Sequence, residues 1–262
     1  MNPAPWESPV KKKLREGKPV IGALLAVSSA ETAAHISKLG FDFLWIEMEH
    51  SPISLETLRT MVLATRGLPA MPFARVPVNE IWMAKRVLDA GVSGVVFPFT
   101  STPELARQAA AACRYPPLGR RGSGADLAKA AWPEPQRYYD SADENVTVVA
   151  MIEEAAAVEN IEEIAATPGI DVLFIGTSDL SFSFGLRGDQ DHPRVLEAAA
   201  KVIAAGKRHG KYLGRTAFDA SRLPRYIEEG YQFLTGPSEL NFIAAGVKRY
   251  FELAGLPGNA AL

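Results

Sequence analysis

Polar and charged side chains follow four short apolar runs of the sequence, and their types can bind metals, move protons or hold anions. The first group is Glu47-Met48-Glu49-His50, and Arg75 ends the next apolar run. Glu153-Glu154 and Gly176-Thr177-Ser178-Asp179 follow two later runs. If these runs are parallel strands of a barrel, their carboxyl ends meet at one face, where the active sites of such folds lie. We therefore treat the four groups as parts of one candidate site.

His50 is the histidine best placed for proton transfer among the four in the chain. His35 lies within a helical pattern, while His192 and His209 stand at the start and the end of another helix. Only His50 follows a predicted strand. A loop histidine fits a plain surface position equally well, but the carboxylates beside it favour a general base or acid.

Glu153 and Asp179 follow adjacent predicted strands, so their carboxylates can converge on one point. Two hard oxygen ligands that leave positions open for water and substrate suit Mg²⁺, Mn²⁺ or Co²⁺ better than a structural zinc. The alternative is that each carboxylate only caps the helix or turn that follows it.

Arg75 ends its predicted strand and precedes Val76-Pro77. A guanidinium at the mouth of a barrel is a good partner for a carboxylate or a developing oxyanion. It could instead form a salt bridge with Glu47 or Glu49. The backbone N–H groups of Gly176-Thr177-Ser178 could bind a carboxylate, although this turn is a weak signal by itself.

The elements that would position these residues are β-type runs that alternate with helical patterns. The expected strands are 20–27, 42–47, 71–75, 94–98, 146–153, 171–175, 212–215 and 233–235. The expected helices are 30–38, 55–66, 80–89, 103–113, 155–166, 193–209, 220–229 and 239–253. Eight such units within 262 residues predict a single α/β domain, a (β/α)₈ barrel.

A doubly wound open sheet is the competing fold. It loses support because no Gly-x-Gly-x-x-Gly pattern follows the first strand, where the chain has Val27-Ser28-Ser29-Ala30. One connection, at about 114–145, is far longer than the usual link between a helix and a strand. It could be a disordered insertion, but Trp132, Tyr138 and Tyr139 favour an ordered loop with a function.

Composition excludes several partners and sites. The chain has 28 Lys plus Arg against 30 Asp plus Glu, a formal net charge of −2, and no basic tract that would favour a nucleic acid or a membrane surface. Cys113 is the single cysteine, so neither an internal disulfide nor a thiolate metal site is expected. No apolar stretch approaches the length of a membrane span, and we expect no signal peptide at residues 1–17. We expect a cytoplasmic protein.

Four segments resemble the HpcH/HpaI aldolases, which are metal-dependent class II pyruvate aldolases with a TIM barrel of the phosphoenolpyruvate/pyruvate type. The family includes 2,4-dihydroxyhept-2-ene-1,7-dioate and 2-keto-3-deoxy sugar acid aldolases. The segments read FLWIEMEHSP (43–52), YPPLGRRG (115–122), MIE (151–153) and FIGTSDLS (174–181), and the similarity runs from about residue 14 to residue 247.

The resemblance implies roles for particular residues. Glu153 and Asp179 match the family's metal ligands, His50 its catalytic base and Arg75 the arginine that stabilises the enolate. The backbone N–H of Ser178 matches a group that binds the substrate carboxylate, next to Asp179.

Asp89 matches an aspartate that raises the basicity of the histidine. Its place at a helix end before the fourth strand puts it on the opposite face of a barrel from His50, so a neighbouring subunit could supply it, or its role is structural. Three positions depart from the family: Met151 replaces a Gln that contacts substrate, Leu24 replaces a Trp, and Gly176-Thr177-Ser178 replaces Gly-Pro-Ala. These departures put the substrate preference in doubt.

The expected function is reversible retro-aldol cleavage of a 4-hydroxy-2-oxo acid to pyruvate, or hydroxypyruvate, and an aldehyde. A Mg²⁺ or Mn²⁺ ion, or Co²⁺, would hold the 2-oxo acid, while Arg75 shares its charge and His50 takes the proton of the 4-hydroxyl. The lysines lie on or near predicted helices, which argues against a Schiff base. A 2-oxo acid carboxy-lyase of the oxaloacetate decarboxylase type, using the same site, and a non-catalytic 2-oxo acid binding barrel are the alternatives.

The resemblance also implies a homo-oligomer, a trimer or a hexamer, in which the long loop approaches a neighbour's site. Leu127 or Trp132 could then contact the aldehyde. We expect the C-terminal helix to take part in the subunit contacts.

Overall fold

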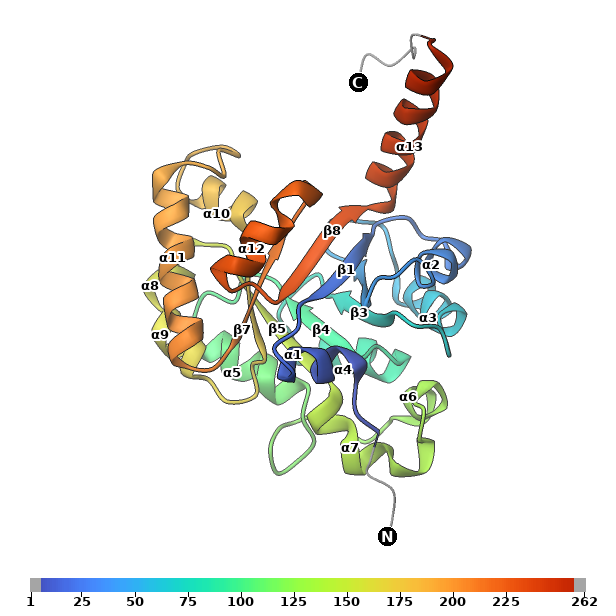
Figure 1. Cartoon of the computed structure of the whole chain (residues 1–262). Coiled ribbons are helices and arrows are strands. Elements are labelled where there is room, and N and C mark those ends of the chain that lie inside the picture. The colour runs from blue at the N-terminus through green and yellow to red at the C-terminus, as the bar shows by residue number, and fades with distance from the viewer. Residues whose placement is uncertain (1–5, 257–262) are drawn as a thin grey trace.

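A closed barrel of parallel strands forms the centre of the molecule. The computed structural model describes residues 6–256. Each strand pairs with the next along the chain, and the last pairs with the first (Figure 1). The strands are β1 (Val20–Leu25), β2 (Phe43–Glu47), β3 (Met71–Arg75), β4 (Gly94–Phe97), β5 (Thr147–Ile152), β6 (Val172–Ile175), β7 (Tyr212–Thr216) and β8 (Phe233–Ser238). The predicted (β/α)₈ barrel is confirmed.

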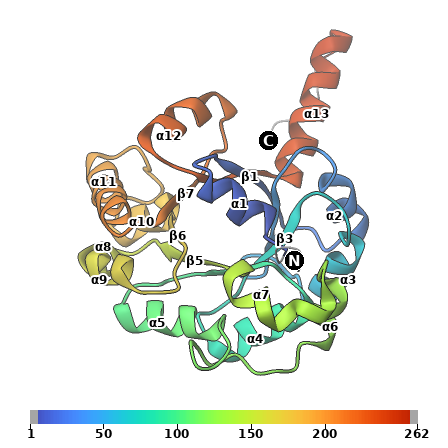
Figure 2. The same ribbon diagram turned by 60° about the horizontal axis from the view of Figure 1, so that its bottom comes forward.

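Helices surround the barrel, and Figure 2 shows them as a ring. Those that were expected are α2 (Ala30–Ile36), α3 (Leu55–Ala64), α4 (Ile81–Ala90), α5 (Pro103–Ala112), α8 (Ala155–Glu159), α9 (Ile161–Ala166), α11 (Pro193–Arg208), α12 (Leu223–Glu229) and α13 (Glu239–Ala254). The helix expected at 155–166 is therefore two helices, which meet at Asn160. The side-chain amide of Asn160 donates to the backbone oxygen of Ser101, 3.0 Å away, and ties this break to the loop after β4.

Several elements were not expected from the sequence. The first is α1 (Pro9–Arg15), whose Val10 and Leu14 pack against the inner side chains of the barrel and close its amino-terminal end. The second is α10 (Thr177–Ser183), directly after β6. The long connection at 114–145 contains α6 (Asp126–Ala131), a 3₁₀ turn (Pro135–Arg137) and α7 (Tyr138–Asn145). It is ordered, as its aromatic residues predicted, and has a small core of its own.

Aromatic side chains fill the interior of the barrel. The ring centroids of Phe43 and Phe233 lie 4.3 Å apart, and those of Trp45 and Phe174 lie 4.9 Å apart. Gly22 makes room for these rings, since a Cβ there would lie 2.3 Å from the ring of Phe43. Aromatic rings therefore fill the lower and middle parts of the barrel interior, which leaves the carboxyl ends of the strands as the part of the barrel that is open to a ligand.

The uppermost full layer of inner side chains comes from the four odd-numbered strands. The strand registers and the tilt of a closed barrel bring Leu24, Arg75, Met151 and Thr216 to one level. We call this layer the floor of the mouth. Because β3 and β7 lie opposite each other in a ring of eight strands, Arg75 and Thr216 face each other across the barrel axis.

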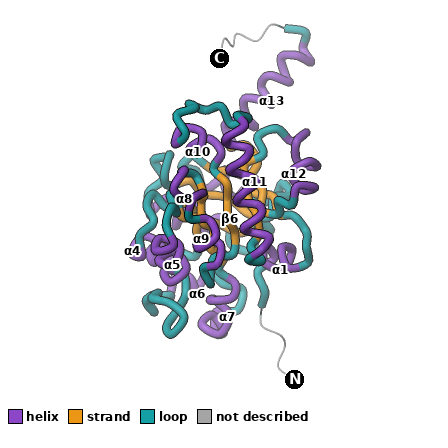
Figure 3. Tube along the Cα trace, turned by 90° about the vertical axis from the view of Figure 1, so that its left-hand side faces the viewer, coloured by secondary structure: helices purple, strands orange, loops and turns teal. Residues whose placement is uncertain are grey.

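The last helix, α13, leaves the barrel instead of packing along it (Figures 1 and 3). Its apolar side chains are exposed, including Leu240, Ile243, Val247, Tyr250 and Leu253. Within residues 6–256, no helix has both the length and the apolar character needed to cross a membrane.

Candidate active site

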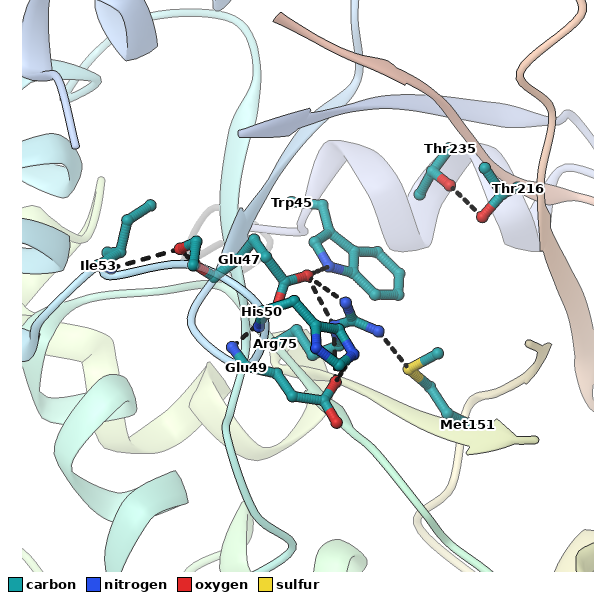
Figure 4. Close-up of polar contacts among 10 residues, drawn as sticks. Trp45, Glu47, Glu49, His50, Ile53, Arg75, Met151, Thr216 and Thr235 are labelled. Atoms are coloured by element: carbon teal, nitrogen blue, oxygen red, sulfur yellow. Dashed lines mark hydrogen bonds and ion pairs between the residues drawn. The ribbon is translucent and has the colours of Figure 1, made fainter. Parts of the chain in front are cut away.

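The structure places most of the predicted site residues at the carboxyl ends of the strands. Arg75 ends β3, His50 lies in the loop after β2, and Glu153 follows β5 directly. Asp179 lies in the first turn of α10, which follows β6. Figure 4 shows part of this mouth, where Arg75, His50 and Met151 come together from three elements.

Arg75 is held by two carboxylates, one at the end of β2 and one in the loop that follows it. Its Nη2 lies 2.6 Å from Oε2 of Glu47, and its Nε lies 2.7 Å from the same oxygen. The Nε is also 3.1 Å from Oε2 of Glu49. The salt bridges considered from the sequence therefore form, with both glutamates. Among residues 6–256, the one hydrogen-bond partner of the other nitrogen, Nη1, is the weakly accepting sulfur of Met151 at 3.7 Å, so Nη1 can still donate to a ligand.

Glu47 shapes the loop that carries His50. Its Oε1 accepts the backbone N–H of Glu49 at 2.7 Å and that of His50 at 3.0 Å. Its Oε2 accepts the indole N–H of Trp45 at 3.3 Å, and its backbone oxygen accepts the hydroxyl of Ser51. From the sequence, Glu47 was expected only as a possible salt-bridge partner of Arg75. The signal was present, since alternate residues of a barrel strand point inward and Glu47 continues the inward series of Phe43 and Trp45.

Glu153 carries a carboxyl group that is almost completely buried, with 1% of the residue exposed. Its Oε1 accepts the backbone N–H of Phe99 at 2.7 Å. Phe99 has a φ of +47°, a strained conformation for this residue, which points to a functional constraint at this loop. On the other side lies Gly176, where a Cβ would be 2.8 Å from Oε2 of Glu153. The absence of a side chain at Gly176 leaves this oxygen accessible.

Burial is the main reason that the pKa of Glu153 rises, to about 7. The carboxylates of Glu49 and Asp179 raise the pKa further, while the N–H of Phe99 and the charge of Arg75 oppose the shift. Three carboxyl groups, from the segments after β2 and β5 and from α10, therefore act on one another electrostatically, and one arginine does not neutralise them. Such a site favours a bound cation.

Glu49 and His50 form the outer edge of this group. The pKa of Glu49 is raised by burial, and by the charges of Glu47 and Asp179, against the opposing effects of Arg75 and His50. The Nε2 of His50 lies 3.7 Å from Oε2 of Glu49, and 61% of the imidazole side chain is exposed. His50 is thus close to a buried carboxylate and open to a ligand that enters from solvent.

The carboxylates fit an ion such as Mg²⁺ or Mn²⁺ because they are hard oxygen donors, and Oε2 of Glu153 is unobstructed. Among residues 6–256, no group of three or more His, Cys, Asp or Glu side chains is arranged to hold a metal by itself. A site built on Glu153 and Asp179 would therefore leave positions open for water and substrate. Ser178, at the second position of α10, is exposed beside Asp179.

Asp89 lies at the opposite end of the barrel from the other predicted site residues. It stands near the end of α4, at the amino-terminal side of the barrel, and its Oδ1 is 3.6 Å from Nη2 of Arg121. Burial raises the pKa of Asp89, and Arg121 opposes that shift. A single chain therefore does not bring Asp89 to His50. Leu127 lines the same shallow pocket as Asp89, whereas Trp132 is buried against Trp6.

Two threonines at the mouth were missed. Thr216 ends β7 and Thr235 lies on β8, and the hydroxyl of Thr235 donates to that of Thr216 at 3.2 Å. A single hydroxyl in an apolar run is a weak signal, because only the register of the strands shows that both side chains point inward.

Comparisons with known proteins agree with this geometry. Residues 21–244 match the family model described as HpcH/HpaI aldolase/citrate lyase. A 5-keto-4-deoxy-D-glucarate aldolase of Salmonella arizonae is 34% identical over 249 residues, which cover 95% of this chain and 97% of the relative.

Two solved structures are similar over nearly their whole length. The HpcH/HpaI aldolase/citrate lyase family protein from Burkholderia cenocepacia is 34% identical, with a TM-score of 0.87, over 94% of this chain and 99% of its own. The HpcH/HpaI aldolase from Desulfitobacterium hafniense is 29% identical, with a TM-score of 0.85, over 95% of this chain and 98% of its own. The chain belongs to the HpcH/HpaI aldolase/citrate lyase family.

Proposed function

We propose that the chain is a divalent-metal-dependent class II aldolase that reversibly cleaves 4-hydroxy-2-oxo acids to pyruvate, or hydroxypyruvate, and an aldehyde. The aldolase relatives support a carbon–carbon lyase of this class. The observation that carries the proposal is the buried carboxyl group of Glu153, which lies near two other carboxylates and close to Arg75.

Glu153, through its accessible Oε2, and Asp179 would hold the ion, Mg²⁺ or Mn²⁺, with Co²⁺ as a further candidate. A divalent ion in this position would act as a Lewis acid on a 2-oxo acid and offset negative charge on its 2-oxo oxygen. Phe99 would keep the other oxygen of Glu153 in place through its N–H, which is 2.7 Å away.

Arg75 would bind the substrate and share the negative charge that develops when the C3–C4 bond breaks. Its Nη2 and Nε are fixed by Glu47 and Glu49, so the guanidinium is already oriented before the substrate enters. Its Nη1, beside Met151, is the nitrogen left to donate. Met151 itself cannot donate a hydrogen bond, so it would only contact the substrate.

His50 would take the proton of the 4-hydroxyl group, directly or through a water molecule. Glu49 would stabilise the imidazolium that results, because its Oε2 lies 3.7 Å from Nε2. The first-turn N–H of Ser178 would bind the substrate carboxylate. Asp89 would assist His50 only if a second copy of the chain supplied it.

A substrate panel with and without metal tests this proposal. We expect 4-hydroxy-2-oxo acids to yield pyruvate or hydroxypyruvate and an aldehyde, with loss of turnover in EDTA and recovery in Mg²⁺ or Mn²⁺. Asp179→Asn should raise the metal concentration needed for half-maximal activity at least tenfold, whereas Asp191→Asn, at an exposed carboxylate, should not. Undiminished turnover in excess chelator would refute the metal requirement. Decarboxylation of oxaloacetate without aldol cleavage would assign a carboxy-lyase, and binding without turnover would assign a binding barrel.

We also propose that the enzyme acts on small molecules in the cytoplasm as a homo-oligomer, a trimer or a hexamer. The exposed apolar side chains of α13 support subunit contacts through this helix, because contiguous exposed apolar surface usually marks an interface.

A further inference from the structure

The hydrogen-bonded pair of Thr216 and Thr235 has no part in the mechanism above. Thr235 is buried, with 1% of the residue exposed, and Thr216 is half-buried at the end of β7. The two residues face each other in the register of β7 and β8. In Figure 4 they lie on the far side of Trp45 from Glu49 and His50, away from the charged groups.

The direction of this hydrogen bond leaves Thr216 able to donate. Because the hydroxyl of Thr235 donates to Thr216, the hydroxyl proton of Thr216 is not used in that bond. No acceptor for that proton is found within residues 6–256. A half-buried hydroxyl at the mouth, fixed from below by a buried neighbour, is therefore ready to bind a polar group of a ligand.

Thr216 belongs to the floor of the mouth, and the other side chains of that layer determine what a ligand would contact there. Of the four side chains in that layer, Leu24 is a hydrocarbon and Met151 a thioether, and Arg75 is already turned toward Glu47 and Glu49. Thr216 is the remaining polar member and lies across the barrel axis from Arg75. A 2-oxo acid that rests on this floor, with its 2-oxo oxygen near Arg75 and its carboxylate near the N–H of Ser178, would have C3 as the end that can approach Thr216.

We infer that Thr216, held by Thr235, is a specificity-determining residue that hydrogen-bonds to a hydroxyl group on C3 of the 2-oxo acid. The site would then favour a 3-hydroxylated 2-oxo acid such as hydroxypyruvate over pyruvate, whose C3 is a methyl group. This inference rests on the proposed function, since it concerns which 2-oxo acid the aldolase site accepts. A site that pairs with a substrate hydroxyl discriminates against the analogue without it, because its own polar group is then left unpaired.

The test compares hydroxypyruvate and pyruvate with one fixed aldehyde, glycolaldehyde, in saturating Mg²⁺ or Mn²⁺. The measured quantity is the ratio of kcat/KM for hydroxypyruvate to that for pyruvate. Thr216→Val keeps the shape and removes the hydroxyl, and Thr216→Ser is the matched control that keeps the hydroxyl. Thr235→Val removes the group that orients Thr216. Circular dichroism and the Tm of each variant check that the barrel is folded.

We expect the wild-type ratio to exceed 1 and to fall about tenfold in Thr216→Val, which is the size of one hydrogen bond. The ratio for Thr216→Ser should stay within about threefold of the wild-type ratio. The ratio for Thr235→Val should lie between those of the two Thr216 variants. A ratio that is unchanged in Thr216→Val, or that falls equally in Thr216→Ser, would overturn the inference. Turnover of pyruvate with none of hydroxypyruvate would overturn it as well.

A second measurement separates this inference from the proposed function. In D₂O without aldehyde, an aldolase of this class should exchange the C3 hydrogens of its 2-oxo acid, which proton NMR detects as loss of signal. Exchange with pyruvate but without preference for hydroxypyruvate would refute the role of Thr216 and leave the aldolase intact. No exchange and no aldol turnover with either acid would refute the proposed function, and the inference with it.

Discussion

Burial makes the ionised carboxylate of Glu153 unfavourable in the metal-free protein, and a bound cation would offset that cost. The carboxyl group of Glu153 is buried, and two other carboxylates act on it. The pKa of about 7 means that the folded protein without metal holds a proton that the unfolded chain, with a pKa of 4.5, releases. Between these two values the folded state binds more protons than the unfolded state.

The free energy of unfolding of the metal-free protein should therefore fall as pH rises from about 4.5 through about 7. Glu153→Gln removes the titrating group, so we expect this variant to be more stable than wild type above pH 7 by up to about 3 kcal/mol. The two proteins should be nearly equal below the unfolded pKa. Urea unfolding in EDTA at a series of pH values measures the difference.

Glu162→Gln is the matched control for this prediction. Glu162 is exposed, and its hydrogen bond with Arg208 lowers the pKa of the carboxyl group instead of raising it. The control should show no gain in stability above pH 7. A Glu153→Gln variant that gains nothing there, or gains equally at all pH values, would contradict the buried, proton-holding state of Glu153.

At the scale of elements, the site depends on how closely β5 and the start of α10 approach each other. Gly176 joins β6 to α10, and its missing side chain leaves space for the carboxylate of Glu153. Its φ is not in the left-handed region, so the requirement for glycine comes from contact and not from backbone conformation.

Gly176→Ala should reduce activity at least tenfold, because its Cβ would lie 2.8 Å from both Cβ and Oε2 of Glu153 and displace the carboxylate. Overpacking of this kind costs about 1 to 3 kcal/mol of stability. Steady-state kinetics at several metal concentrations and thermal unfolding measure both effects. Gly236→Ala is the control, since a Cβ on this glycine would meet its neighbours only at ordinary contact distances of 3.5 Å or more. Full activity of Gly176→Ala would show that Glu153 does not need this space.

The sequence predicts the strands well because each is a short apolar run, and the four groups of polar residues mark where such runs end. It misses α10, since Thr177–Ser183 is short and begins as a turn rich in small polar residues. It also misses α1, where the lysines obscure the apolar pair Val10 and Leu14 that packs under the barrel. The break between α8 and α9 depends on a tertiary hydrogen bond of Asn160, which no local pattern reveals.

Sequence position was sufficient to predict that His50, Arg75, Glu153 and Asp179 lie at one face of the barrel, because parallel strands bring their carboxyl ends together. Sequence position was insufficient to place Glu47, Thr216 and Thr235 in the mouth, because only the register of the strands shows that their side chains point inward. The role of Asp89 stays a prediction, since its ion pair with Arg121 lies at the other end of the barrel.

At the scale of the whole molecule, α13 is the element that a lone chain leaves most exposed. Ile243, Val247 and Tyr250 recur at intervals of three and four residues, so they lie along one face of the helix. Exposure of such a face is costly in water and is relieved when a second copy covers it.

The double variant Ile243→Asp/Val247→Asp should dissociate the proposed homo-oligomer, since it places two charges in the apolar face. Sedimentation velocity at micromolar concentration should show a smaller species than wild type, while circular dichroism should still show a folded barrel. Lys248→Asp changes a residue that is already charged and should keep the wild-type mass. A monomeric wild-type protein, or an unaltered mass in the double variant, would exclude α13 as the contact.

The closure of the amino-terminal end of the barrel by α1 affects the order in which the two products would leave. Within residues 6–256, Val10 and Leu14 pack under a barrel whose interior is filled by aromatic rings, so under the proposed function both products would leave through the mouth at the carboxyl ends of the strands. If the 2-oxo acid rests on the floor, the aldehyde lies above it, nearer to solvent. Cleavage would then follow an ordered sequence: the aldehyde departs first, and the 2-oxo acid, trapped beneath it until then, departs last.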